Sequence, residues 1–252
     1  MWVIASRELR SLFISPLAWS ILGAIQIILG WFFAVLVEWF LQPEVQTNLA
    51  SDPNASGLTS IVITSLFDWI AIIFLLATPL LTMRLISEER RNNTLPLLLS
   101  APISMGNIIL GKFLGLMAFF LIMLAMLMLM PLSLLLGGTL DFGQLLSGLL
   151  GLILFSGVLI AIGLYISTLT SHPTVAAIST FGTFLLLWML DWGGNITEAQ
   201  DDIFSLSYWS ITNHYQSLLQ GLFSTADVVF YLLMIGLFLM LSTYRLDAER
   251  IQ

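Results

Sequence analysis

The amino-acid sequence predicts an all-α integral membrane protein with six transmembrane helices and both termini in the cytoplasm. Hydrophobic residues make up 58% of the 252 residues and charged residues only 9%, whereas soluble globular domains carry roughly 25% charged residues. The apolar residues form long stretches, and all eight Lys and Arg residues lie near residues 7–10, 84–112 and 245–250. Because short cytoplasmic loops collect Lys and Arg, these three regions are expected to lie inside.

The remaining connections contain acidic residues and no Lys or Arg, which places them outside. The net charge of −7 therefore divides into a basic inner side and an acidic outer side. A nucleic-acid partner is excluded, because it would require a basic stripe. The chain contains no cysteine, which excludes disulfides, thiol catalysis and thiolate metal sites.

Six apolar stretches approach or exceed the length of about 20 residues that a helix needs to cross a bilayer. We expect the spans near residues 17–37, 61–83, 108–136, 145–169, 175–192 and 228–241, within a single membrane domain covering residues 1–252. Glu38 and Asp68 fall near the outer ends of their spans. Ionisable residues deep in the membrane mark ion-coupled carriers, so their absence from the span interiors argues against a secondary transporter.

The segment before the first span, residues 1–15, is expected to form an amphipathic helix in the inner membrane interface. Apolar side chains recur at helical spacing on one face: Trp2, Ala5, Leu9, Leu12 and Phe13. The other face carries Arg7, Arg10 and Ser11, with Glu8 between the arginines. Pro16 then ends this helix before the first span. The alternative is a frayed basic segment without regular structure.

Two further segments are expected outside. Residues 42–60 are rich in turn-forming residues and are predicted to be a loop. Residues 193–223 include a stretch too polar to span but amphipathic enough to lie on or dip into the outer leaflet. This second segment is a candidate gate or docking surface for a partner, and its candidate residues are His214, Tyr215, Leu218 and Leu219.

The longest inner connection, residues 83–115, reads MRLISEERRNNTLPLLLSAPISMGNIILGKFLG. Its order of charged, polar, apolar and Ser-x-Pro-Ile elements, followed by Gly-Lys at the start of a helix, resembles the signature loop of ABC-2-type transporter permeases. Residues 215–246 resemble the C-terminal end of the GldF-like branch, which is named for gliding motility. Together the resemblance covers essentially the whole chain.

The resemblance implies that residues 84–106 contain a cytoplasmic coupling helix, which docks in a cleft of a separate ATPase subunit. Apolar anchors would supply affinity and charges would set the register. The implied contact residues are Glu88, Glu89, Arg90, Arg91, Thr94, Leu95, Leu98 and Pro102. The family commonly has Gly at the position of Asn93 and often Glu at that of Pro96, and Pro96 should shorten or kink the helix. The alternative is a solvated charged loop that only sets the topology.

A nucleotide site within this chain is not expected. Residues 106–112 match the spacing of a phosphate-binding loop, G-x-x-x-x-G-K, but Phe113 follows in place of the Ser or Thr that binds magnesium. We therefore interpret Lys112 as an anchor that extends to the inner interface. The chain is expected to bind no cofactor itself, and ATP and magnesium are expected on the partner ATPase.

The expected function is the permease subunit of an ATP-driven ABC transporter, an exporter in the bacterial inner membrane. The resemblance implies a permease homodimer, or a heterodimer with a second permease, and a GldG-like extracytoplasmic auxiliary protein. Small residues four apart, such as Gly111 and Gly115 or Ser179 and Thr183, would serve packing within the chain or this dimer interface. One alternative is a non-transporting subunit that transmits force to a partner protein. Another is a secondary carrier or channel.

Overall fold

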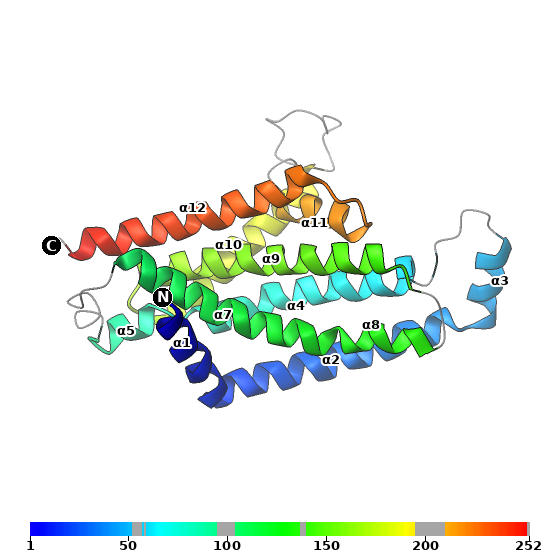
Figure 1. Cartoon of the computed structure of the whole chain (residues 1–252), viewed down its shortest axis with the longest axis horizontal. Helices are drawn as coiled ribbons and strands as arrows, with labels where there is room; N and C mark the ends of the chain where they lie inside the picture. Colours follow the sequence, from blue (N-terminus) through cyan, green and yellow to red (C-terminus); the bar gives the residue numbers. More distant parts are fainter. Residues whose placement is uncertain (52–56, 58, 95–103, 137–139, 195–209, 251–252) are drawn as a thin grey trace.

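The structure, a computed structural model, describes residues 1–51, 57, 59–94, 104–136, 140–194 and 210–250. Within these ranges the chain forms helices and no strand, which confirms the predicted all-α class. The long helices lie side by side in an elongated bundle, and α3 extends beyond one of its ends (Figure 1). The elements in chain order are α1 Trp2–Ile14, α2 Pro16–Phe40, α3 Pro43–Ser51, the π-helix η1 Thr59–Ile63, α4 Thr64–Thr82, α5 Ser87–Arg91, α7 Met105–Leu127, α8 Leu129–Ser133, the 3-10 helix η2 Leu134–Leu136, α9 Phe142–Leu169, α10 Pro173–Gly194, α11 Ile211–Leu219 and α12 Thr225–Arg250.

Five of the six expected spans form helical runs that are long and apolar enough to cross a membrane. These runs are Pro16–Phe40, Thr59–Arg91, Met105–Leu136, Phe142–Leu169 and Thr225–Glu249. The remaining expected span, near residues 175–192, forms α10, in which Pro173–Met189 is a shorter apolar stretch. Because a span requires about 20 residues, the count of six stays a prediction.

Helix α9 occupies the middle of the bundle and packs against α4, α7, α10, α11 and α12 (Figure 1). Small residues permit this close packing. A Cβ atom added to Gly163 would lie 2.4 Å from Thr82 Oγ1 of α4, and one added to Gly157 would lie 2.8 Å from Ile235 of α12. Small residues on one helix therefore admit larger side chains from two neighbours.

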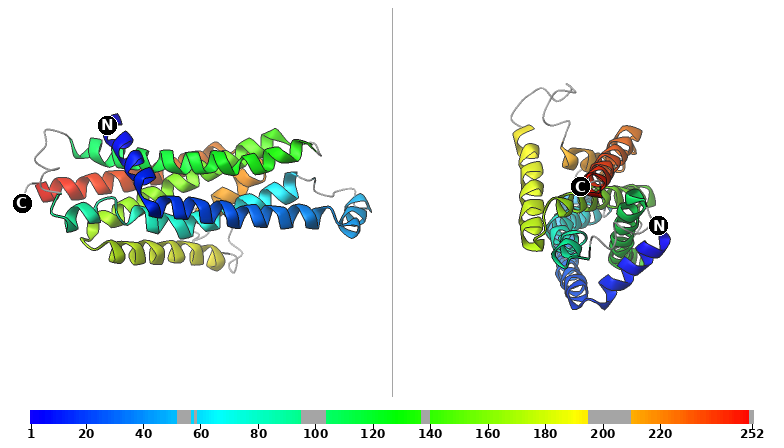
Figure 2. Two further views of the ribbon diagram at one scale, coloured as in Figure 1. Left: turned by 90° about the horizontal axis from the view of Figure 1, so that it is seen from below. Right: turned by 90° about the vertical axis from the view of Figure 1, so that its left-hand side faces the viewer.

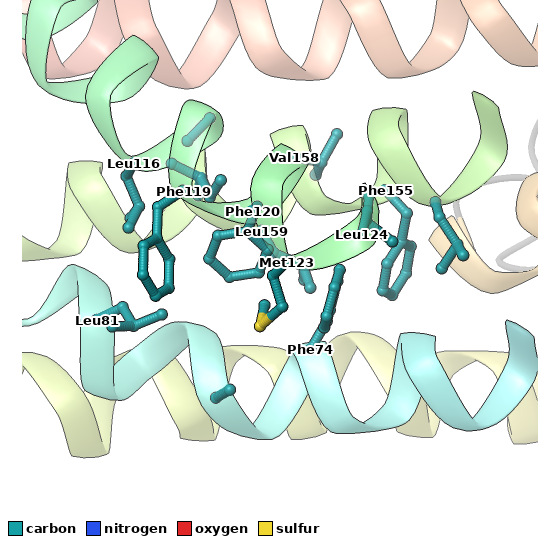
Figure 3. Close-up of a cluster of buried hydrophobic side chains, with 14 of the residues drawn as sticks. Phe74, Leu81, Leu116, Phe119, Phe120, Met123, Leu124, Phe155, Val158 and Leu159 are labelled. Atoms are coloured by element: carbon teal, nitrogen blue, oxygen red, sulfur yellow. The ribbon is translucent and has the colours of Figure 1, made fainter. Parts of the chain in front are cut away.

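The apolar core lies where α4, α7 and α9 meet, and Figure 3 shows the side chains from all three helices converging. Phe74 of α4 and Phe120 of α7 are fully buried, and their rings meet edge to face with centroids 4.9 Å apart. Leu159 of α9 and Met123 of α7 complete this contact. Edge-to-face aromatic pairs add about 0.5–1.5 kcal/mol beyond the burial of their area.

Helix α1 crosses the bundle direction instead of following it (Figures 1 and 2). Pro16 is the first residue of α2, and the extended backbone of Ser15 separates the two helices, as the sequence predicts. The apolar face of α1 covers α7, where Ile4 and Ala5 lie against Gly111 and Gly115. These glycines therefore serve packing within the chain.

Trp2, which the sequence assigns to the apolar face of α1, is 77% exposed. The structure corrects the expectation of a loop in the neighbouring outer segment. The turn-rich segment 42–60 contains the helix α3 as well as the start of η1. Pro43 at the first position of α3 has the fixed φ angle of a helix start, and Glu44 in the first turn suits the positive end of the helix dipole.

Candidate functional site

The charged part of the expected coupling segment forms the short helix α5, which is anchored to the end of α9. The hydroxyl of Ser167 accepts hydrogen bonds from the backbone N–H groups of Ile86 and Ser87, each at 3.1 Å. Helix α5 ends at Arg91, and Asn93 two residues later has a φ of 55°. The Thr94 N–H donates to Glu89 O and the Asn93 N–H to Arg90 O, which is the Schellman arrangement. After glycine, Asn is among the residues that tolerate this left-handed backbone best.

Lys112 of α7 is the buried centre of this region. Its Nζ lies 2.9 Å from Glu89 Oε1 of α5 and 3.4 Å from Glu8 Oε2 of α1, and its side chain is only 3% exposed. Lys112 is therefore not an anchor that extends to water, as the sequence suggested, but a link between two other helices. Burial of an isolated ammonium is costly, and the two carboxylates offset part of that cost.

Arg90 makes the second set of links from α5. Its Nη2 donates to both carboxylate oxygens of Glu249 in α12 and to the carbonyl oxygen of Thr168 at the end of α9, all at 2.8 Å. Arg245 Nε lies 3.5 Å from the same Glu249 carboxylate. We refer to Glu8, Glu89, Arg90, Lys112 and Glu249 as the charge cluster. Through it, α5 is joined to α7, α9 and α12 directly and to α1 through Lys112.

The expected coupling residues divide into two groups. Glu88, Arg91 and Thr94 are exposed. The side chains of Glu89 and Arg90 instead form ion pairs with other helices. The Glu89 Oε2 and Arg90 Nε atoms are buried without a hydrogen-bond partner among the described residues. The other three expected contact residues lie outside the described residues: Leu95, Leu98 and Pro102. That these residues contact an ATPase stays a prediction.

The outer candidate residues lie on α11, and three of the four are buried in the bundle. Tyr215, Leu218 and Leu219 are at most 2% exposed. The Tyr215 hydroxyl donates to Phe67 O of α4 at 3.0 Å, and Leu218 O accepts from Ser147 Oγ of α9 at 2.7 Å. Burial raises the pKa of the Tyr215 phenol well above its usual value, so it remains a neutral donor.

Helix α11 is also fixed to the start of α12 by a residue that sequence reasoning missed. Asp227 accepts from Ser217 Oγ, and its Oδ1 lies 2.6 Å from His214 Nδ1. The ring of His214 stacks on Phe230 with centroids 4.1 Å apart. Three of the four side chains expected at an outer gate or docking surface are therefore packed inside the chain, and their role in a gate stays a prediction. Asp227 follows Ser224 by three residues at the start of α12. This spacing is the sequence signal that could have indicated a contact of Asp227.

A bundle of membrane-length helices with a short charged helix linked to several of them defines a multi-pass membrane protein with a candidate transmission element. The family model described as ABC-2 family transporter protein matches residues 2–250. The chain belongs to this family, whose membrane components generally work with an ATPase subunit. No curated protein matches the chain.

Proposed function

We propose that the chain is the permease subunit of an ATP-driven exporter in the bacterial inner membrane, and that α5 receives motion from a separate ATPase. The observation that supports this most is the charge cluster, because a single short helix is linked there to α1, α7, α9 and α12. A displacement of α5 would act on all of these helices together.

The cluster is suited to a change between two arrangements. Its ion pairs hold α5 in one position, while Glu89 Oε2 and Arg90 Nε remain without a partner in the described part of the chain. A shifted α5 could therefore exchange partners without exposing the charges to lipid. Coupling between distant sites requires such an element with two discrete arrangements. The exposed Glu88 and Arg91 would contact the ATPase, and Glu89, Arg90 and Lys112 would pass on the motion.

Two variants separate contact with the ATPase from transmission of its motion. Each variant is purified in mild detergent, and the proteins bound to it are identified by mass spectrometry. Glu88→Ala with Arg91→Ala removes exposed charges only, and we expect the ATPase to be lost. Arg90→Gln with Glu249→Gln removes both members of the buried-side ion pair and leaves only the half-exposed Arg245 without its carboxylate partner. We expect this variant to retain the ATPase but to lose stimulation of ATP hydrolysis in reconstituted vesicles.

The outcome that contradicts the proposal is a chain that purifies without any ATPase and still moves a solute, which would indicate a carrier. Loss of ATPase binding in both variants would instead mean that the charge cluster forms the contact surface itself. The wild-type chain and an Arg84→Gln variant are the controls, since Arg84 is exposed and forms no ion pair among the described residues.

The second candidate is an ABC membrane subunit that transmits force to a partner without transporting a solute. The apolar core between α4, α7 and α9 favours it, because buried hydroxyls there, such as those of Thr78 and Thr82, bond to carbonyls of their own helix. Stimulation of ATP hydrolysis only by a partner's outer domain would support this function. Stimulation by a solute would support export. A permease dimer and a GldG-like auxiliary protein belong to either proposal.

A further inference from the structure

The side of α1 that points away from α7 forms a surface with mixed chemistry. Val3 and Ile14 are 83% and 71% exposed, and the exposed Arg7 and Arg10 lie between them on the same side of the helix. Together with Ser6 and Ser11 they line a shallow groove of about 430 Å³. In the end-on view of Figure 2, α1 lies at the edge of the bundle opposite α10.

The two arginines in this groove retain their charge for an external ligand. Neither forms an ion pair within the part of the chain that the structure describes, and the nearby Glu8 is already paired with Lys112. Residues three apart on a helix have Cβ atoms about 5–6 Å apart. Two guanidinium groups at that spacing can share one phosphate, with which Arg forms paired hydrogen bonds.

The surroundings of the arginines indicate that the phosphate belongs to a lipid. Helix α1 crosses the direction of the membrane-length helices, so it lies along the membrane plane when they span it (Figure 1). Trp2 at the start of α1 and Trp19 in the first turn of α2 are 77% and 56% exposed, and indole rings favour the headgroup layer. A phospholipid supplies a phosphate for the arginines and acyl chains for the exposed apolar side chains, and so covers both kinds of surface.

We propose that the α1 groove is a binding site for an anionic phospholipid. Its phosphate lies between Arg7 and Arg10, and its acyl chains lie over Val3 and Ile14. The lipid then holds α1 at the membrane surface, on the side opposite to the Glu8–Lys112 ion pair. This assignment is independent of the proposed ATPase coupling, because it concerns the face of α1 that the charge cluster does not use.

The test uses the full chain without any ATPase, in detergent with equal amounts of phosphatidylglycerol and phosphatidylcholine, and native mass spectrometry counts the bound lipids. We expect the wild type to retain several-fold more phosphatidylglycerol, and Arg7→Gln with Arg10→Gln to bind both lipids equally. Arg7→Lys with Arg10→Lys should keep most of the preference. Arg84→Gln is the matched control, an exposed arginine outside the groove, and should bind lipid as the wild type does.

An unchanged preference in the double Gln variant would overturn the proposal, and so would an equal loss in Arg84→Gln, which would indicate a general effect of charge. Displacement of phosphatidylglycerol by inorganic phosphate alone would assign the groove to free phosphate. Val3→Asn with Ile14→Asn keeps both arginines and tests the acyl-chain contacts if the Gln variant fails to fold. We expect it to lose bound phosphatidylglycerol, and full retention would contradict the assignment.

Discussion

Only 3% of the Lys112 side chain meets solvent. Two carboxylates pair with Lys112, and their side chains are 21% exposed for Glu8 and 20% exposed for Glu89. Removing one member of a buried ion pair is more damaging than removing the whole pair, because the remaining charge keeps its desolvation cost and loses its partner. Lys112 pairs with two carboxylates, so substituting Lys112 alone leaves both of them close together without a cation.

We therefore expect Lys112→Met to lower the free energy of unfolding by about 3–5 kcal/mol, the range found when a buried pair loses one partner. Thermal unfolding in detergent measures the effect. The triple variant Glu8→Gln, Glu89→Gln, Lys112→Met should recover most of the loss, because no charge is then left unpaired. A Lys112→Met protein as stable as the wild type would mean that the ion pairs seen here do not hold α1 and α5 together.

The residues of α11 predict that it does not span the membrane, but they do not predict which surface it packs against. Its amphipathic pattern predicted a non-spanning segment, and the structure agrees that Ile211–Leu219 is short and separate from the spans. The pattern could not show which surface its apolar face meets. Small residues of α9 decide this, because Gly151 leaves room for Leu218 and Tyr215 at 3.2 and 3.3 Å from where a Cβ would lie.

From this packing we expect Leu218→Asp to reduce the amount of folded protein in the membrane. Leu218 is fully buried, and an unpaired charge at such a position costs several kcal/mol. Gln216→Asp is the control, since Gln216 is exposed on the same helix. Quantitative immunoblotting of membranes makes the comparison, and equal abundance of the two variants would remove the packing role.

The sequence predicted spans better than contacts, and the reason is physical. A span follows from the number of consecutive apolar residues, which is a local property. The ion pairs of Lys112 join residues 104 and 23 positions away in the chain, so no local pattern contains them. Likewise the family resemblance implied that Arg90 contacts an ATPase, whereas its pairing with Glu249 depends on where α12 ends.

At the scale of the whole molecule, the position of α10 determines the topology. Helix α10 has 22 residues, which at 1.5 Å per residue gives about 33 Å, close to the hydrocarbon thickness of about 30 Å. If α10 crosses the membrane, α11 lies on the side opposite to α5, and α12 returns to the side of α5. The ion pair between Arg90 and Glu249 requires these two residues on the same side, which favours a crossing α10.

Single cysteines can test this topology directly, because the chain contains none of its own. We expect Glu88→Cys and His172→Cys to react with a membrane-impermeant maleimide only after the cells are permeabilised. Leu222→Cys, which replaces a side chain that is 63% exposed, should react in intact cells. Labelling of residues 172 and 222 from the same side would mean that α10 does not cross. In that case α12 would place Glu249 on the far side of the membrane from Arg90, and the charge cluster could not form as described.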